Sequence, residues 1–512
     1  SDRIKNLRSV PMRLELREGM NQCQIIDDTY NNDLAGLQIS LEFLSNQHQK
    51  KKKRLILSDI AESGVPDNEL VRKISDLVSK HGIHGFIGIG PVLSAFKDHF
   101  HGKTDFFEMT EQFLAHFDFS DFDHEIILVK GARSFQFERI VNRLQRKVHG
   151  TVMEIDLGAI ADNLNFFRSR LKPSTRIMVM VKAFAYGSGS IEIANVLQYH
   201  RVDYLGVAYA DEGVELRKNN ISIPVMVMNP SEETFEALIR YNLEPEIYSF
   251  RILGLFLKFL DGRPARIHLK LDTGMHRLGF EKKDVPDLCQ ILKTNPQVKI
   301  ASIFSHLAGS DESSHDDFSK MQAASFESMA ERLVEVLNYR PLFHLLNSPG
   351  ILRVPGYQYD MVRLGIGLYG INPTKESFQS LKPVATLKTI ISQIKKIPAG
   401  ETIGYGRKGV APREMTLATI AIGYADGFSR AFSRGVGEVL VHGKKAKVVG
   451  NVCMDMTMVD ITGIPAAEGD EVIIFGKDYP LYSLAERINT IPYELLTNTS
   501  ERVKRVFVAE SI

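Results

Sequence analysis

Residues 150–380 repeat one pattern eight times, a short apolar run followed by a segment with the spacing of an amphipathic helix. The runs are rich in β-branched residues, which is typical of parallel strands buried on both faces. Eight such strands alternating with helices match the count and the size of a (β/α)8 (TIM) barrel. The expected strands are residues 176–182, 202–208, 223–229, 244–249, 266–272, 300–306, 341–347 and 359–365.

The segment before this repeat has a similar but shorter alternation. The runs QIIDD, RLILSD, HGFIGIG and HEIILVKG are the expected strands, and Leu34–Ser45, Asn68–Lys80 and Phe135–Arg146 are the expected helices. Strands that alternate with helices predict a parallel sheet with helices on its faces. We therefore expect a Rossmann-like α/β domain over residues 1–147.

The segment after the repeat is different, because strand follows strand with glycine-containing turns between them. The expected strands are TLKTIISQIKKI, LATIAIGYA, GEVLVHG, AKVVGN, MTMVDI and EVIIFG, with a short helix near Ser483–Ile488. This pattern predicts a mainly-β domain. The whole chain is then an α/β protein with domains at 1–147, 148–380 and 381–512.

Composition limits the kind of partner. The 63 Lys and Arg residues nearly balance the 62 Asp and Glu residues, which disfavours a protein that binds nucleic acid or an anionic membrane. No apolar run is long enough to span a membrane, and the polar start does not resemble a signal peptide. Cys23, Cys289 and Cys453 are far apart and form no metal-ligand pair, so we expect a reduced, cytoplasmic protein without a metal site.

Lys182 ends the first apolar strand of the expected barrel. Barrel active sites lie at the carboxyl ends of the strands. Burial there would lower the pKa of the amine, as suits a lysine that attacks a carbonyl group. On this strand alone, a surface lysine that extends its amine into solvent stays an alternative.

Several further motifs occur in a fixed order, namely VKAFAYGSG, HLKLDTGMHRLG, FSHLAGSD, HLLNS, MVRLGIGLYG, IGYGR, IAIGYADG and GNVCMDMTMVD. Together they closely resemble bacterial alanine racemase over about residues 151–512. Members of that family are homodimeric fold-type III enzymes that use pyridoxal 5'-phosphate (PLP) to interconvert L- and D-alanine. The resemblance implies that this chain supplies D-alanine for peptidoglycan synthesis.

The resemblance also implies the catalytic residues. Lys182 matches the lysine that holds PLP and acts as one base, and Tyr405 matches the second base, which the partner subunit supplies. Racemisation needs an acid or base on each side of Cα, because the proton leaves one face and returns to the other. In the family the lysine takes the proton from D-alanine and the tyrosine takes it from L-alanine. Tyr424 matches a tyrosine that lines the substrate entrance from the partner subunit.

Other residues match the family's cofactor site. Arg363 matches the arginine that binds the pyridine nitrogen, and His306 matches the residue that braces it. An arginine does not give up its proton, so the ring nitrogen stays unprotonated and PLP is a weaker electron sink. The positions that match the phosphate-binding residues are Tyr186, Ser348, Gly365 and Ile366, with Asn347 directly before Ser348.

The resemblance places the substrate between three further positions. Arg277 matches the arginine that binds the substrate carboxylate, and Lys270 matches a lysine that is often carbamylated and could then hold Arg277. Met454 and Asp455 match a loop that reaches across the dimer to the substrate. The sequence departs from the family at Phe184, Ser188 and Glu501, where a small polar residue, a histidine and a tyrosine are usual.

Residues 1–147 resemble the C-terminal domain of the Mur ligases, most nearly the D-alanyl-D-alanine-adding ligase. The matching pieces are residues 12–15, 27–32, 57–62 and 128–133, with departures at Val71 and Ala132. The resemblance implies that Asp28, Tyr30 and Asn31 face a nucleotide. The sequence has no GxxxxGK(S/T) phosphate loop, so we expect the C-terminal part of a ligase–racemase fusion without ligase activity of its own.

Three alternatives compete with an alanine racemase. The missing phosphate loop disfavours an ATP-dependent ligase, and Tyr405 with the β domain disfavours a non-catalytic PLP carrier. Arg363 disfavours a decarboxylase. A racemase of broad amino-acid specificity stays open, since selectivity depends on pocket volume.

Overall fold

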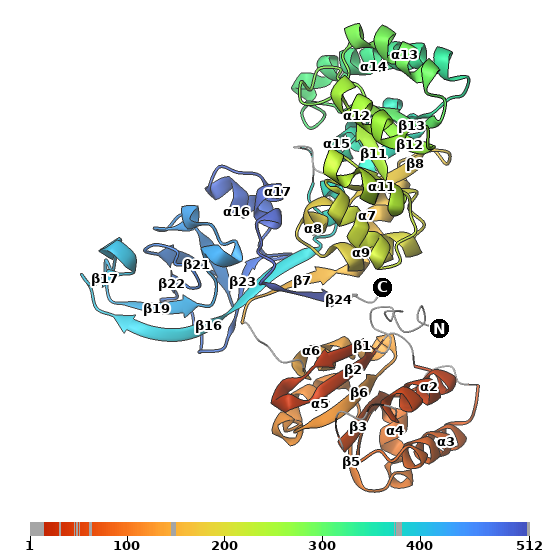
Figure 1. The fold of residues 1–512 in the computed structure, drawn as a ribbon. Coiled ribbons are helices and arrows are strands. Elements are labelled where there is room, and N and C mark those ends of the chain that lie inside the picture. Colours follow the sequence, from red (N-terminus) through yellow and green to blue (C-terminus); the bar gives the residue numbers. More distant parts are fainter. Residues whose placement is uncertain are drawn as a thin grey trace. The chain divides into compact units, whose positions relative to one another are not determined.

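The computed structural model describes residues 15–29, 32–45, 47, 50, 52–60, 64–144, 150–372, 374 and 381–508. The chain divides into two compact units, residues 1–148 and 149–510. Figure 1 shows the helices and strands of both units. In the described ranges, no helix has both the length and the apolar content needed to span a membrane.

The first unit is a six-stranded sheet with helices on both faces. The strand order is β1-β2-β6-β3-β4-β5, and only β1 runs antiparallel to its neighbour. The strands are β1 (Glu15–Glu18), β2 (Gln24–Asp28), β3 (Lys52–Ser58), β4 (Gly85–Ile89), β5 (Lys103–Phe107) and β6 (Glu125–Lys130). The helices are α2 (Leu34–Ser45), α3 (Asp67–Lys80), α4 (Pro91–Ala95), α5 (Thr110–His116) and α6 (Glu138–Leu144).

Alternate residues of these strands form two separate cores. Ile26, Leu55 and Leu57 pack with α2 and α3 on one face. Ile25, Ile56 and Ile127 pack with α5 and α6 on the other face. Because successive side chains of a strand point to opposite faces, continuous apolar runs produce a sheet covered on both sides. The expected α/β domain is therefore present, with β1 and β5 as strands that the sequence did not predict.

The second unit contains a closed barrel of eight parallel strands, which confirms the expected fold class. The strands are β8 (Arg176–Met180), β9 (Tyr204–Val207), β10 (Val225–Val227), β11 (Glu244–Ile247), β12 (Ala265–Lys270), β13 (Val298–Phe304), β14 (Leu342–His344) and β15 (Met361–Leu364). The helices are α7 (Leu157–Arg168), α8 (Lys182–Tyr186), α9 (Ser190–Tyr199), α10 (Ala210–Lys218), α11 (Phe235–Arg240), α12 (Phe250–Leu260), α13 (Val285–Thr294), α14 (Asp316–Leu337) and α15 (Ser348–Arg353).

Closure of the barrel determines which residues share its mouth. The last strand, β15, pairs with the first, β8, and Arg363 lies opposite Met178 in that register. Residues just after β8 and residues at the end of β15 therefore meet, although they are far apart in sequence. Lys182, just after β8, and Arg363, on β15, therefore belong to neighbouring strands of the barrel.

The rest of the second unit is an eight-stranded sheet in the order β19-β22-β21-β20-β23-β16-β7-β24, with a further pairing of β19 and β16. Its strands are β7 (Val152–Asp156), β16 (Ala385–Ile397), β19 (Met415–Ile420), β20 (Glu438–Val441), β21 (Lys444–Val449), β22 (Thr457–Asp460), β23 (Glu471–Phe475) and β24 (Lys504–Val508). A separate hairpin joins β17 (Thr402–Ile403) and β18 (Gly409–Val410), and two helices follow the sheet, α16 (Leu481–Arg487) and α17 (Pro492–Thr497).

The β7 strand lies in a different domain from the one that the sequence predicts for it. Residues 152–156 were assigned to the barrel segment, but they pair with β16 and β24 in the β-domain sheet. The chain therefore passes through the β domain first, forms the barrel, and then returns. Figure 1 shows β7 beside β16 and β24, where the β domain meets the barrel.

Candidate active site

Lys182 begins a short left-handed turn at the carboxyl end of β8. The four residues that follow it, 183–186, have φ angles between 49° and 54°. This conformation costs roughly 1–2 kcal/mol per residue for L-amino acids, so neighbouring groups must hold it. Glu212 does so, because its carboxylate accepts hydrogen bonds from the backbone N–H groups of Ala183 and Ala208, each at 2.6 Å. The turn thus fixes the lysine at the barrel mouth.

The surroundings of Lys182 favour its neutral amine. Burial lowers the pKa of Lys182, and the positive charges of Arg277 and Lys270 lower it further. The carboxylates of Glu212 and Glu246 oppose this effect. A lysine with a depressed pKa is a better nucleophile and a better base near neutral pH than an ordinary surface lysine.

A cradle for an anion lies beside this lysine. The backbone N–H groups of Gly365 and Gly367 donate to Ser348 Oγ at 2.9 and 3.3 Å, which leaves the Ser348 hydroxyl hydrogen free to donate outward. A Cβ atom on Gly365 would lie only 3.0 Å from the Tyr186 hydroxyl oxygen, so glycine keeps this space open. The Ser348 and Tyr186 hydroxyl groups beside this glycine are suited to bind a phosphate. Tyr369 packs against Tyr186 with ring centroids 4.6 Å apart.

Two further residues expected at this cradle, Ile366 and Asn347, have different surroundings. Ile366 begins the turn that follows Gly365 and is buried. The Asn347 side chain accepts from Gly350 N–H at 3.1 Å and from Ser310 Oγ at 2.7 Å, so it caps α15. Its predicted contact with a cofactor stays a prediction.

Arg363 is a buried cation held by the ends of three neighbouring strands. It donates to the carbonyl oxygens of Ser305 and Leu345 at 2.6 and 2.9 Å, and to Nδ1 of His344 at 2.7 Å. His306 Nδ1 lies 3.3 Å from the same guanidinium group. Burial lowers the pKa of Arg363 to about 10, so the group is still a cation at neutral pH. Burial and the Arg363 charge hold the pKa values of His306 and His344 well below the usual range, which makes both neutral acceptors.

His344 was not predicted as a site residue, although its hydrogen bond to Arg363 is shorter than that of His306. It belongs to a buried chain of side chains that crosses three strands. Ser302 Oγ lies 2.7 Å from His344 Nε2 and 2.6 Å from His268 Nδ1, and His268 Nε2 lies 2.9 Å from Glu244. The chain links Arg363 to a carboxylate and fixes the plane of its guanidinium group.

A second charged cluster lies beside Lys182. Lys270 on β12 and Glu246 on β11 form a buried ion pair, with Nζ and Oε1 3.1 Å apart. Arg277 follows in the loop after β12 and has an exposed side chain. Asp272 braces that loop, since its Oδ1 accepts from the backbone N–H groups of residues 274–276 at 3.0 to 3.1 Å. Glu246 is a further residue that the sequence did not predict.

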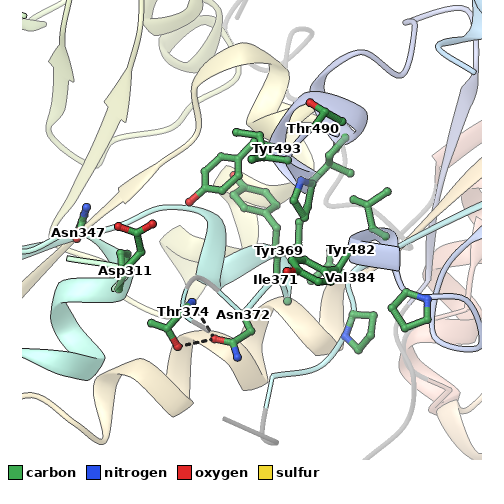
Figure 2. A pocket seen from close by; sticks show the side chains of 18 of the residues that line it. Asp311, Asn347, Tyr369, Ile371, Asn372, Thr374, Val384, Tyr482, Thr490 and Tyr493 are labelled. Atoms are coloured by element: carbon green, nitrogen blue, oxygen red, sulfur yellow. Dashed lines mark hydrogen bonds between the residues drawn. The ribbon is translucent and has the colours of Figure 1, made fainter. Parts of the chain in front are cut away.

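A cavity of about 1050 Å³ lies between the barrel mouth and the helices α16 and α17. Figure 2 shows that Tyr369, Tyr482 and Tyr493 line it together with Asp311 and Asn347. His306 also lines the cavity, and the ring of Tyr493 lies 6.3 Å from that of Tyr186. The cavity therefore adjoins both the anion cradle and the Arg363 cluster.

The other predicted residues form a separate group in the β domain. Tyr405 is 73% exposed and Met454 is 54% exposed, and Tyr424 and Asp455 are exposed as well. Their loops are joined to each other, since Asn451 donates to the Tyr405 carbonyl at 3.1 Å and Tyr424 N–H donates to the Cys453 carbonyl at 3.0 Å. Tyr405 comes directly after β17, which Figure 1 shows at the far end of the β domain from α8. Within one chain, Tyr405 and Lys182 are therefore apart.

The three departures from the family pattern have distinct environments. The guanidinium group of Arg505 lies over the ring of Phe184, with Cζ of Arg505 5.5 Å from the ring centroid. Ser188 is fully buried, and Glu501 is exposed. The neighbouring Arg502 pairs with Asp426 and Asp455, each at 2.8 Å, and thereby ties the C-terminal segment to the loops of Tyr424 and Met454.

The first unit has a polar cluster at the carboxyl ends of its parallel strands. Asp28 at the end of β2 is buried and lies 2.7 Å from Lys130 Nζ at the end of β6. Asp59, just after β3, accepts from the backbone N–H groups of Val92 and Leu93 at 2.9 Å. Tyr30 and Asn31, predicted to face a nucleotide, lie outside the described residues. The described residues of the whole chain bring together no group of three metal-ligating side chains.

Comparisons with known proteins agree over the entire second unit. Residues 155–373 match the family "Alanine racemase, N-terminal domain", and residues 384–507 match "Alanine racemase, C-terminal domain". The chain is 36% identical to alanine racemase 1 of Clostridium acetobutylicum over 376 residues, which cover 71% of this chain and 96% of that protein. It is 35% identical to the alanine racemase of Methanococcus maripaludis over 374 residues, which cover 70% and 99%.

Two solved structures extend the agreement to the fold. The alanine racemase of Clostridium difficile 630 aligns with a TM-score of 0.67 at 35% identity, covering 71% of this chain and 97% of that one. The alanine racemase of Bartonella henselae, described with covalently bound pyridoxal phosphate, aligns with a TM-score of 0.65 at 30% identity, covering 70% and 99%. Since the match extends over nearly the full length of each relative and includes both the barrel and the β domain, the chain belongs to the alanine racemase family.

Proposed function

We propose that residues 149–508 catalyse the PLP-dependent interconversion of L- and D-alanine, with Lys182 of one subunit and Tyr405 of the partner subunit as the two bases. The observation that carries the proposal is Lys182 itself. It is a lysine of depressed pKa at the mouth of the barrel, next to a buried arginine cluster, in a chain of the alanine racemase family. Its product, D-alanine, is a building block for peptidoglycan synthesis.

The residues at the barrel mouth fit PLP. The cofactor has a phosphate, an aldehyde and a pyridine nitrogen, and the site offers the Ser348 and Tyr186 hydroxyl groups, the Lys182 amine and the Arg363 guanidinium group for them. The glycine at position 365 supports this match, because a Cβ there would lie only 3.0 Å from the Tyr186 hydroxyl oxygen. When bound, PLP withdraws electrons from Cα of the amino acid and makes its proton removable.

Each residue then has a definite task. Lys182 accepts the Cα proton on one face and returns it, for which its depressed pKa is suited. Tyr405 of the partner subunit serves the opposite face, so that a proton taken on one side can be replaced from the other. Arg363 stays a cation and donates to the ring nitrogen, while Arg277 binds the substrate carboxylate.

We also propose that the enzyme is a homodimer whose β-domain loops cover the barrel mouth of the partner. The support is the exposed set formed by Tyr405, Tyr424, Met454 and Met456, which lie on connected loops. A cluster of exposed aromatic and apolar side chains is typical of an interface. In such a dimer, Tyr405 of the partner subunit would lie at the active site. In this arrangement Tyr424, Met454 and Asp455 would line the substrate entrance.

For the first unit we propose a descent from the C-terminal domain of a Mur ligase. Its doubly covered sheet and the polar cluster of Asp28, Lys130 and Asp59 support this origin, because open α/β sheets bind ligands at the carboxyl ends of their strands. The unit would face a nucleotide only in the company of a phosphate-binding domain. The three free cysteine thiols of the chain support a cytoplasmic location.

The proposed reaction predicts a preference for alanine. The purified chain with added PLP is expected to convert L-alanine to D-alanine at least about tenfold faster than it racemises serine or glutamate, a discrimination that differences in side-chain fit can supply. The measurement is chiral chromatography of the three reactions in parallel. Equal rates would instead support a racemase of broad specificity, and bound PLP without turnover would support a carrier.

The buried ion pair between Asp28 and Lys130 allows a test of whether the first unit acts independently of the racemase reaction. Lys130→Met removes the cation from the buried Asp28 carboxylate, so it should destabilise the first unit by about 3–5 kcal/mol. Lys73→Met is the matched control, because its partner Glu69 is exposed and such a pair contributes at most about 1 kcal/mol. We expect alanine turnover to stay unchanged in both variants. Calorimetric unfolding measures the effect, and equal melting profiles would contradict the role assigned to Lys130.

A further inference from the structure

Glu246 is a carboxylate with an unusual environment. The residue is 0% exposed, and among the described residues its oxygens have no hydrogen-bond donor nearby apart from the Lys270 ammonium group. It lies on β11, next to β12, which carries Lys270. Lys270 is only 3% exposed, and its Nζ atom lies 3.1 Å from Oε1 of Glu246. Burying a charged carboxylate is costly, so compensating charges must hold it.

Those charges are the cations of the proposed active site. Burial raises the pKa of Glu246, while Lys270, Arg363 and Arg277 act in the opposite direction. The second carboxylate near Lys182 is Glu212, and three backbone N–H groups already occupy its oxygens. The oxygens of Glu246, unlike those of Glu212, accept no backbone hydrogen bond in the described residues. Glu246 is therefore the carboxylate of this cluster that can pair with a cation.

We propose that Glu246 is a positioning residue that supplies the negative charge behind Arg277, so that Lys270 works as an unmodified ammonium group and carries no carbamate. The inference rests on the proposed function and concerns how this chain holds the substrate carboxylate. A carbamate forms when a neutral amine attacks CO2, with an N–C bond formed and a proton released. Burial lowers the pKa of Lys270, but the ion pair with Glu246 opposes this shift and favours the protonated amine. A carbamate at Lys270 would also place two anions side by side in a buried site.

The first test needs no turnover. The PLP-loaded enzyme is equilibrated with 13C-bicarbonate, and carbamate is detected by 13C NMR. We expect no carbamate signal from the wild-type enzyme. A wild-type signal that disappears in Lys270→Met would overturn the proposal. In Glu246→Gln the amine loses its anion and burial lowers its pKa further, so we expect a signal to appear.

The matched control is Glu244→Gln. Glu244 is a buried carboxylate on the same strand, but it pairs with Arg266 and His268 rather than with Lys270. We expect this variant to stay free of carbamate. A carbamate in Glu244→Gln would mean that any loss of charge on β11 triggers the reaction, which contradicts a specific role for Glu246.

The second test separates substrate binding from turnover. Glu246→Gln should raise the KM for alanine about tenfold or more, because Arg277 loses a charged support, while kcat changes less. Added bicarbonate should lower that KM again and leave the wild-type enzyme unaffected. An unchanged KM in Glu246→Gln would overturn the proposal. If the wild-type enzyme turned over no alanine, the proposed function would fail, but the NMR result would still decide whether Lys270 is modified.

Discussion

Lys182→Ala is expected to remove the visible absorption band of bound PLP and to lower alanine racemisation by roughly three to four orders of magnitude. The reason is that one side chain has two tasks, since it holds the cofactor and moves the proton on one face of Cα. The lowered pKa of Lys182, caused by burial and by two neighbouring cations, suits both tasks. An absorption spectrum and a chiral assay of the same sample measure the two effects.

A matched control separates these effects from a general loss of structure. Lys172→Ala changes an exposed lysine shortly before β8, the same strand that Lys182 follows. We expect this variant to keep both the absorption band and the rate. A Lys182→Ala enzyme with an unchanged visible band would contradict the assignment of Lys182 to the cofactor.

Much of the barrel could be predicted from the sequence because its signal is local. Each strand is a short apolar run between helical segments, and all eight expected strands are present. The position of Lys182 could be predicted for the same reason, since a residue at the carboxyl end of a barrel strand lies at the mouth of the barrel. Closure of the barrel then brings β15, which carries Arg363, next to β8, which Lys182 follows, without any local signal in the sequence.

Residues whose role depends on pairing register could not be predicted in this way. Glu246 and Lys270 meet because β11 and β12 are neighbours, and His344 meets Ser302 and His268 across three strands. In the sequence alone, a glutamate that is buried and paired cannot be distinguished from any other polar residue within an apolar strand. The strand pairing of β7 with β24 is similar, because it joins residues 152–156 to residues 504–508 at the two ends of the second unit.

Tyr405→Phe is expected to lower racemisation by about two to four orders of magnitude while PLP stays bound. The variant loses the hydroxyl group that serves one face of Cα but keeps the ring. Lys182 can still remove a proton from D-alanine and return it to the same face. In D2O, D-alanine should therefore exchange its Cα hydrogen without racemising, whereas L-alanine should not exchange.

NMR of the Cα hydrogen in D2O measures this difference directly. Tyr424→Phe is the control, since Tyr424 is also an exposed tyrosine on the connected loops but has no proton to carry. We expect it to retain most of the activity. If Tyr424→Phe proved the more damaging change, the roles of the two tyrosines would be reversed.

The same two variants can show whether the sites are shared between subunits. In a mixed dimer of Lys182→Ala and Tyr405→Phe chains, one site combines an intact Lys182 with an intact Tyr405 of the partner subunit, and the other site lacks both. If subunits exchange at random, half of the dimers are mixed and one of their two sites is intact, so about a quarter of the wild-type activity should return. Sites completed within one chain would give no recovery on mixing. The separation of β17 and α8 within one chain makes recovery the expected result, because in the proposed dimer Tyr405 of one chain serves Lys182 of the other.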